Sequence, residues 1–361
     1  MKKGKLSFLK NTAVYGSVLI CILCVLLKVN DMSLEEGAEL LFYAAGVVPE
    51  EATPMPQLQQ TETDESVQWT EEYNMIENGE IVPYHEFTLP GTQATPDPNR
   101  SSLPVEEIQA QGGTQVDNFY VKDSTGSGTD LAQELLSDPA IQMQANGEPE
   151  VLLYHTHTSE AYSDAFTGFY YSDMTTRTQN QEMSVVAVGE AIKAELEKAG
   201  IGVIHDTTVN DLSFNGSYER SWETLQKNLA EYPTIQVTID IHRDSMTTDA
   251  GVKYKPTAEI GGRKAAQVMI LAGCDADGGW GDFPDWRDNL HLALRFQQKA
   301  MQMVPELMRP MTFSNSKYNM NATKGSMLIE VGTEVNTAAE AKYSGSLIGE
   351  VLSSLLLDYK A

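Results

Sequence analysis

The C-terminal part of the sequence predicts an α/β domain: a mostly parallel, twisted sheet with helices on both faces. From residue 150 onward, short runs of consecutive apolar residues alternate with longer segments whose apolar residues recur every three or four positions. This alternation is typical of parallel sheets in which helices form the crossovers. We expect strands at residues 151–154, 202–205, 235–241, 268–272 and 326–331, and helices at residues 183–199, 218–232, 289–303 and 337–359.

Helix-capping residues mark the ends of these predicted helices. Gly200 follows the first helix, Pro233 ends the second, and Asp288 precedes the third as its expected cap. Thr337 and Glu340 have the spacing of a capping box, in which each side chain bonds a free backbone N–H of the other residue. The last helix is therefore expected to begin directly after Thr337.

The chain of 361 residues carries a formal net charge of −26, distributed unevenly. Residues 1–30 contain five lysines and no acidic residue, whereas residues 31–150 contain 24 acidic residues and two basic ones. Residues 151–361 contain 27 acidic and 18 basic residues. This acidity argues against a nucleic-acid-binding protein, which needs clustered Lys and Arg. Three cysteines are too few for a disulfide scaffold or a multi-cysteine zinc module.

Residues 11–29 predict a transmembrane anchor. They lack charge from Ala13 to Leu27 and, at about 19 residues, approach the length of a membrane-spanning helix. Four lysines precede the segment and acidic residues follow it, which places the N-terminus in the cytoplasm and the rest of the chain outside. An uncleaved anchor is favoured over a signal peptide, because residues 27–30 form a poor cleavage site. We expect a cytoplasmic tail and anchor over residues 1–30.

Residues 31–147 predict a largely disordered linker. The segment is acidic and proline-rich, and it lacks apolar periodicity apart from small islands such as residues 116–121. A linker of this length can hold a folded domain many tens of ångströms from a membrane. The folded domain is expected over residues 148–361.

Chemically active side chains lie at the ends of the predicted strands, where ligands of parallel sheets gather. His155 and Glu160 follow the first strand, His242 follows the third, and Glu330 lies in the fifth. Two imidazoles and a carboxylate form a known catalytic zinc arrangement that leaves a fourth position for water. The residues therefore suggest His155, Glu160 and His242 as zinc ligands. Glu330 is then the expected general base.

Each of these residues also has an ordinary structural interpretation. A histidine at a strand end is commonly hydrogen-bonded within the fold and binds no metal. Glu330 is the most informative residue, because a carboxylate between Ile329 and Val331 is costly to bury without a partner or a role. A serine hydrolase is excluded, since no Gly-x-Ser-x-Gly motif is present.

Eight short motifs follow one another along the chain, at residues 154–162, 200–206, 218–221, 240–245, 286–290, 309–310, 318–319 and 328–332. Together, and in this order, they resemble those of the stage II sporulation protein P family. The resemblance covers essentially the whole of residues 150–361. It implies a zinc-dependent peptidoglycan hydrolase of endospore-forming bacteria, similar in fold to N-acetylmuramoyl-L-alanine amidases. It implies cleavage of the bond between the stem peptide and muramic acid, and of peptide cross-links, during engulfment, with stage II sporulation proteins D and M as partners.

The resemblance leaves two ligand positions open. The first motif contains both His155 and His157, and His155 is preferred because it is nearest the strand end. Glu160 matches the glutamate of that motif, but Glu182 is an alternative because it precedes the next helix, where amidases often place a ligand. Arg243, next to His242 in the chain, is expected to orient substrate or to stabilise negative charge.

Two other function classes are compatible with the sequence. The first is a non-catalytic envelope protein that binds peptidoglycan or a partner on the same fold, which predicts no zinc and no release of muropeptides. The second is a metallopeptidase of ordinary proteins, which predicts digestion of casein.

Overall fold

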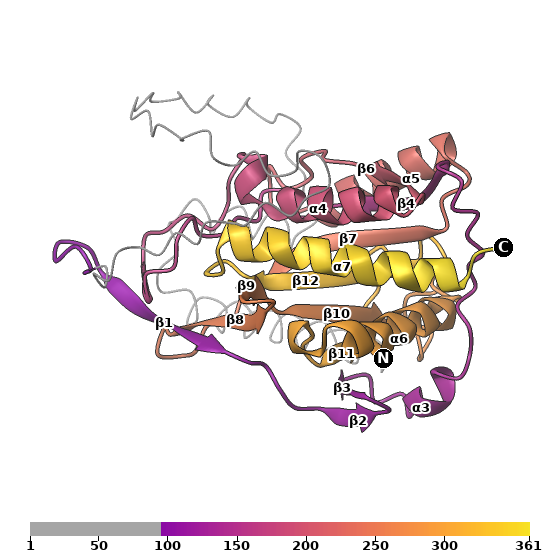
Figure 1. Ribbon diagram of the computed structural model, residues 1–361, viewed down its shortest axis with the longest axis horizontal. Helices are drawn as coiled ribbons and strands as arrows, with labels where there is room; N and C mark the ends of the chain where they lie inside the picture. The colour runs from indigo at the N-terminus through magenta and orange to yellow at the C-terminus, as the bar shows by residue number, and fades with distance from the viewer. Residues whose placement is uncertain (1–94) are drawn as a thin grey trace, which may run out of the picture. The chain divides into compact units, whose positions relative to one another are not determined.

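The computed structural model describes residues 95–361, which form two sheets with helices packed on the larger one (Figure 1). The larger sheet has eight strands in the order β2-β3-β11-β10-β12-β7-β4-β6. Five of its seven strand pairs are parallel, and only β2–β3 and β10–β12 are antiparallel. This agrees with the predicted mostly parallel sheet. The strands are β2 (Thr114–Val116), β3 (Phe119–Asp123), β4 (Pro149–Tyr154), β6 (Gly202–His205), β7 (Val237–Asp244), β10 (Val268–Gly273), β11 (Met311–Ser314) and β12 (Gly325–Thr333).

Helices cover both faces of this sheet, as the alternating side chains of β4 show. Val151 and Leu153 point into the main hydrophobic cluster, whereas Leu152 and Tyr154 belong to a second cluster with Leu225. Leu225 lies on α5 (Ser217–Glu231), which covers this second face. Three helices lie side by side across the main face (Figure 1). They are α4 (Val185–Lys198), α7 (Ala338–Asp358) and α6 (Trp286–Met303).

The predicted caps are present at most helix ends. Thr337 and Glu340 form the expected capping box at the start of α7. The third predicted helix differs, because α6 begins at Trp286 and places Asp288 in its first turn. Trp286 is buried and packs against Phe313 of β11, with ring centroids 6.0 Å apart. Burial of this ring accounts for the additional helical residues.

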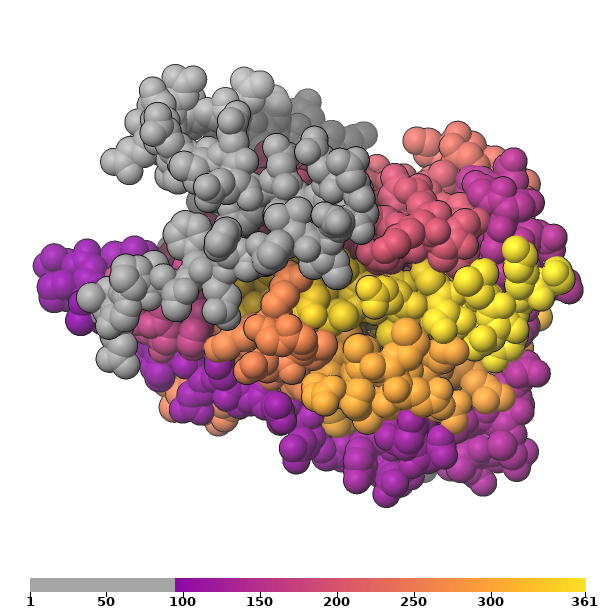
Figure 2. Space-filling view, in the orientation of Figure 1, coloured from indigo at the N-terminus to yellow at the C-terminus, as the bar shows by residue number. Residues whose placement is uncertain are grey.

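Folded structure begins before residue 148, where the sequence analysis placed the start of the domain. β3 pairs with β11 inside the eight-stranded sheet, and its residues Phe119 and Val121 are fully buried. The short helix α3 (Leu131–Glu134) follows. In the space-filling view, residues between 95 and 147 (indigo to purple) border the domain beside α6 (Figure 2). The predicted disordered linker therefore does not extend through the described residues. The short apolar segment at residues 116–121 is stabilised by pairing with β11 at the edge of the sheet, although it is too short to fold alone.

A second sheet of four strands has the order β5-β1-β8-β9. β1 comes from the predicted linker and pairs in parallel with β8, which follows β7 along the chain. Its strands are β1 (Ser102–Ile108), β5 (Phe169–Tyr171), β8 (Lys253–Ile260) and β9 (Arg263–Ala266). The structure also contains two short 3-10 helices, η1 (Gln181–Met183) and η2 (Pro305–Leu307).

The predicted anchor at residues 11–29 and the first part of the predicted linker lie outside the described residues. Within residues 95–361, no helix combines the length and the apolar composition needed to cross a membrane.

Candidate active site

Three neighbouring strands bring most of the predicted site residues together. β4, β7 and β12 lie side by side and run parallel, as the strand-end argument required. Glu330 of β12 is directly opposite His242 of β7 in the strand register. The segment after β4 turns back over the sheet, so that Glu160 reaches His242.

His242 lies between two carboxylates. Its Nδ1 atom is 3.5 Å from Glu160 Oε2, and its Nε2 atom is 3.0 Å from Asp240 Oδ1. The Nε2 atom is buried and makes no hydrogen bond of good geometry. Burial opposes a charge on the ring, but the charges of Asp240 and Glu160 outweigh it and raise the pKa of His242 well above its usual value.

Glu160 is a buried and ionised carboxylate. Its Oε2 atom accepts a hydrogen bond from the backbone N–H of Arg243 at 3.1 Å. Its Oε1 atom lies 4.0 Å from Arg177 Nη2. Burial alone would raise its pKa, but bonding to His242 and the charges of His242 and Arg243 lower the pKa of Glu160 to about 2. Glu160 is therefore negatively charged at neutral pH.

Glu330 has the opposite electrostatic character. Its Oε2 atom is buried without a hydrogen-bond partner, while the residue as a whole keeps some exposure. Burial raises the pKa of Glu330 to about 8, against the opposing charge of His242 and with the support of the Glu160 charge. A carboxyl group with a pKa near neutrality suits general acid–base chemistry.

The structure distinguishes the two histidines of the first motif. His155 is fully buried, and both of its ring nitrogens have partners: Nδ1 contacts Ile241 O at 3.1 Å and Nε2 contacts His205 Nε2 at 2.8 Å. His157 faces the site, with its ring centroid 5.3 Å from that of His242. Its Nδ1 atom is buried and has no hydrogen-bond partner. The arrangement therefore brings to His242 the ring of His157, whose Nδ1 atom has no partner in the protein.

Glu182 lies apart from this group. Its side chain is 76% exposed and pairs with Lys342 of α7 at 3.0 Å. The structure thus brings Glu160, and not Glu182, to His242.

Arg243 has contacts that fit a positioning role. Its guanidinium donates to Ala161 O at 2.9 Å, to Thr176 O at 2.8 Å and to Asp244 O at 3.2 Å. The side chain is only 6% exposed. These bonds hold the segment that carries Glu160, and the charge of Arg243 helps to keep that carboxylate ionised. The action of Arg243 on substrate stays a prediction.

Asp240 is a site residue that the sequence reasoning missed. It is fully buried and accepts hydrogen bonds from the Thr156 backbone N–H at 2.8 Å and the Thr156 hydroxyl at 2.6 Å. Its position two residues before His242 in a β-strand was the available signal, because such residues share one face of the sheet.

The chemistry of these donors fits a zinc ion. Two imidazoles and a carboxylate, from His157, His242 and Glu160, are common zinc ligands. His157 Nδ1 is a buried polar atom without a hydrogen bond, which a metal would satisfy, and His242 Nδ1 faces Glu160 Oε2 at 3.5 Å. Within residues 95–361, however, no three such side chains already converge closely enough to form a complete metal cage.

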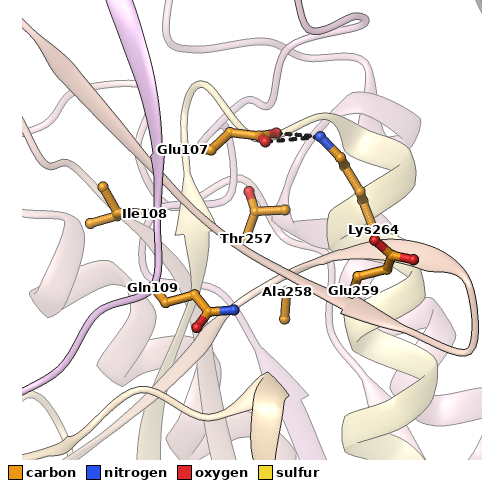
Figure 3. Close-up of a pocket in the computed structure, with 7 residues that line it drawn as sticks. All are labelled: Glu107, Ile108, Gln109, Thr257, Ala258, Glu259 and Lys264. Atoms are coloured by element: carbon orange, nitrogen blue, oxygen red, sulfur yellow. Dashed lines mark hydrogen bonds and ion pairs between the residues drawn. The ribbon is translucent and has the colours of Figure 1, made fainter.

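A separate pocket lies on the four-stranded sheet and contains none of these residues (Figure 3). Its volume is about 260 Å³, and Glu107 and Lys264 are paired across it. It is separate from the candidate site because no residue that lines it belongs to the group around His242.

Comparison with known proteins identifies relatives of the chain. The model of one family, described as Stage II sporulation protein P (SpoIIP), matches residues 50–353. A curated relative, Stage II sporulation protein P of Bacillus subtilis (strain 168), is 27% identical over 229 residues, covering 60% of this chain and 53% of the relative. The chain therefore spans about half the length of this relative.

Two solved structures show similarity at low sequence identity. The catalytic domain of CwlV, an N-acetylmuramoyl-L-alanine amidase from Bacillus (Paenibacillus) polymyxa var. colistinus, is 11% identical with a TM-score of 0.36, covering 58% of this chain and 97% of that chain. The N-acetylmuramoyl-L-alanine amidase AmiC2 of Nostoc punctiforme is 14% identical with a TM-score of 0.34. The match covers 59% of this chain and 98% of that chain.

Proposed function

Because this chain belongs to the stage II sporulation protein P family, we propose that it is a zinc-dependent peptidoglycan hydrolase of spore formation. Its substrate is the amide bond between N-acetylmuramic acid and L-alanine, with peptide cross-links as a second target during engulfment. The observation that carries the proposal is the pairing of Glu330 with His242 across β12 and β7, beside the ionised Glu160.

His157, Glu160 and His242 are the proposed metal ligands. His157 replaces His155 in this set, since both ring nitrogens of His155 already have partners in the protein. A bound zinc ion supplies Lewis-acid polarisation of the scissile carbonyl and of water.

Glu330 acts as the general base and then as the general acid. Its carboxylate accepts a proton from the attacking water and later donates that proton to the leaving nitrogen. Its pKa of about 8 allows both protonation states near neutral pH. Arg243 and Asp240 position the two neighbours of Glu330. The backbone N–H of Arg243 holds Glu160, and Asp240 lies against the His242 ring.

The expected setting is the outer side of a membrane. We propose that the anchor at residues 11–29 holds the domain outside the cytoplasm, where it meets peptidoglycan and the stage II sporulation proteins D and M. Protease treatment of intact protoplasts tests this topology, because removal of the domain from outside supports it and full protection contradicts it.

The hydrolase proposal is tested with the Glu330→Gln variant of the full chain on purified sacculi. We expect release of muropeptides to fall by about 10² to 10⁴, the range of general acid–base catalysis, with zinc still bound. Glu350→Gln, the same change at an exposed position of α7, is the matched control and should keep full activity.

Mass spectrometry of the products separates amide from cross-link cleavage. Muropeptides released at the wild-type rate by Glu330→Gln would contradict the catalytic assignment. A wild-type protein that contains no zinc and releases nothing would instead support a non-catalytic envelope protein. Digestion of casein would favour the metallopeptidase of ordinary proteins.

A further inference from the structure

Three aromatic side chains border the candidate site, and we call Phe214, Tyr218 and Tyr318 the aromatic wall. The Phe214 ring stacks on His157, with centroids 5.0 Å apart and an interplanar angle of 7°. Tyr218 meets His157 edge-on at 5.8 Å. Tyr318 continues the row, with its ring centroid 5.5 Å from that of Tyr218.

The aromatic wall does not contribute to the hydrophobic core. Phe214 is 64% exposed and Tyr318 is 38% exposed, and neither belongs to a core cluster of the described residues. Adjacent exposed aromatic rings beside polar catalytic groups are typical of binding surfaces, since folding gains little from them.

The loop that carries Phe214 is rigidly held. Arg220 of α5 donates to Asn210 O at 2.6 Å and to Asn215 O at 3.2 Å, and it also bonds Ser213 O. At the start of the loop, Asn210 Nδ2 donates to His155 O at 2.9 Å. These bonds fix the loop on both sides of Phe214, so the exposed ring has a defined position.

The turn that carries Tyr318 contains backbone strain. Tyr318 has φ of 43° and Asn319 has φ of 59°, a left-handed conformation that residues other than glycine seldom adopt. The Asn319 side chain stabilises it by donating to Tyr218 O at 2.9 Å and to Ser221 Oγ at 3.0 Å. The strained turn brings Tyr318 against Tyr218 instead of into the core.

We propose that the aromatic wall is a saccharide subsite, which binds a sugar ring of the glycan strand next to the scissile bond. The inference rests on the proposed function, since it assigns the glycan side of that substrate. An aromatic ring carries partial negative charge on its face and attracts the polarised C–H groups of a pyranose. The stem peptide, with small and charged side chains, offers no comparable flat apolar face.

Binding of peptide-free glycan strands of alternating N-acetylglucosamine and N-acetylmuramic acid tests this subsite. The full chain carries Glu330→Gln, so that binding is measured without turnover, and Phe214→Ala or Tyr318→Ala is added. We expect each addition to weaken glycan binding at least about tenfold by calorimetry, which corresponds to about 1.4 kcal/mol. Phe214→Trp, which keeps an aromatic face, should retain binding.

Tyr120→Ala is the matched control, because Tyr120 is also an exposed aromatic residue, at 47%, on β3, which β11 and β10 separate from β12 in the sheet. It should leave glycan affinity unchanged. Affinity within twofold of the parent in both wall variants, or no glycan binding by the parent, would overturn the subsite. Failure of the wild-type protein to hydrolyse sacculi would contradict the proposed function instead, and the binding measurement would still report on the wall.

Discussion

Glu330 and His242 face each other across two neighbouring parallel strands, β12 and β7. The pairing places a carboxyl group of raised pKa beside an imidazole of raised pKa. Glu160 completes the group from the segment after β4, 3.5 Å from His242.

The raised pKa of Glu330 makes stability depend on pH in a defined direction. The folded state holds the proton up to about pH 8, whereas an unfolded glutamate releases it near pH 4.5. The unfolded state therefore binds fewer protons between these values, and the free energy of unfolding falls as pH rises through this window. Glu330→Gln removes this loss, so its stability relative to wild type should increase from pH 5 to pH 8 by on the order of 1–3 kcal/mol. Urea unfolding with a chelator present measures it, and a difference independent of pH would contradict it.

The two histidines of the first motif should respond differently to substitution. His157→Ala should lower the zinc content of the purified protein and abolish activity, with little change in folding, because its Nδ1 atom has no protein partner. His155→Ala should destabilise the fold by about 2–4 kcal/mol, because it leaves a cavity and removes the partner of His205 Nε2. Metal analysis and thermal unfolding of both variants test this, and loss of zinc only in His155→Ala would reverse the assignment.

Gly189 of α4 makes room for the buried histidine pair. A Cβ atom at this position would overlap His205 Nε2 and lie 3.2 Å from His155 Nε2. Gly189→Ala should therefore destabilise the protein by about 1–3 kcal/mol. His205→Ala removes the obstructing ring, so the double variant should lose less stability than the sum of the two single changes. Strict additivity in urea unfolding would show that Gly189 and His205 do not compete for this space.

Lys255 ties the four-stranded sheet to α7. Its ammonium group is fully buried and bonds Glu107 of β1 at 2.8 Å and Glu340 of α7 at 2.6 Å. Lys255→Ala leaves two carboxylates without this partner and should cost about 3–5 kcal/mol. Lys264, which is 49% exposed and also bonds Glu107, is the control, and its replacement by Ala should cost less than about 1 kcal/mol. Hydrogen exchange should show loss of protection in β1 only for Lys255→Ala, and equal effects would contradict this role.

The N-terminal limit of the folded domain is testable by truncation. A fragment of residues 148–361 lacks β3, whose buried Phe119 and Val121 complete the sheet edge at β11. This fragment should be markedly less stable than one of residues 95–361, because two large apolar side chains are lost and a hydrophobic sheet edge is exposed. The soluble yield and the thermal unfolding of the two fragments are compared. Equal stability would show that the domain begins at residue 148.

The sequence by itself determined part of the regular structure of the domain, and other strands, β8, β9 and β11 among them, have no counterpart in the predicted elements. The five strands and four helices that were expected all occur, because apolar periodicity and caps such as Thr337 act over neighbouring residues. It also identified Glu330, because a glutamate between apolar residues of a predicted strand can be recognised from its immediate neighbours in the sequence.

Only the tertiary structure decided which side chains meet. The proposed choice of His157 over His155, and of Glu160 over Glu182, as ligands depends on how the segment after β4 turns back over β7, which residue types alone do not reveal. The place of β1 and β3 in the domain likewise depends on backbone bonds to distant strands. Local patterns encode which segments are regular, whereas long-range pairing and burial decide which atoms lie close enough to react.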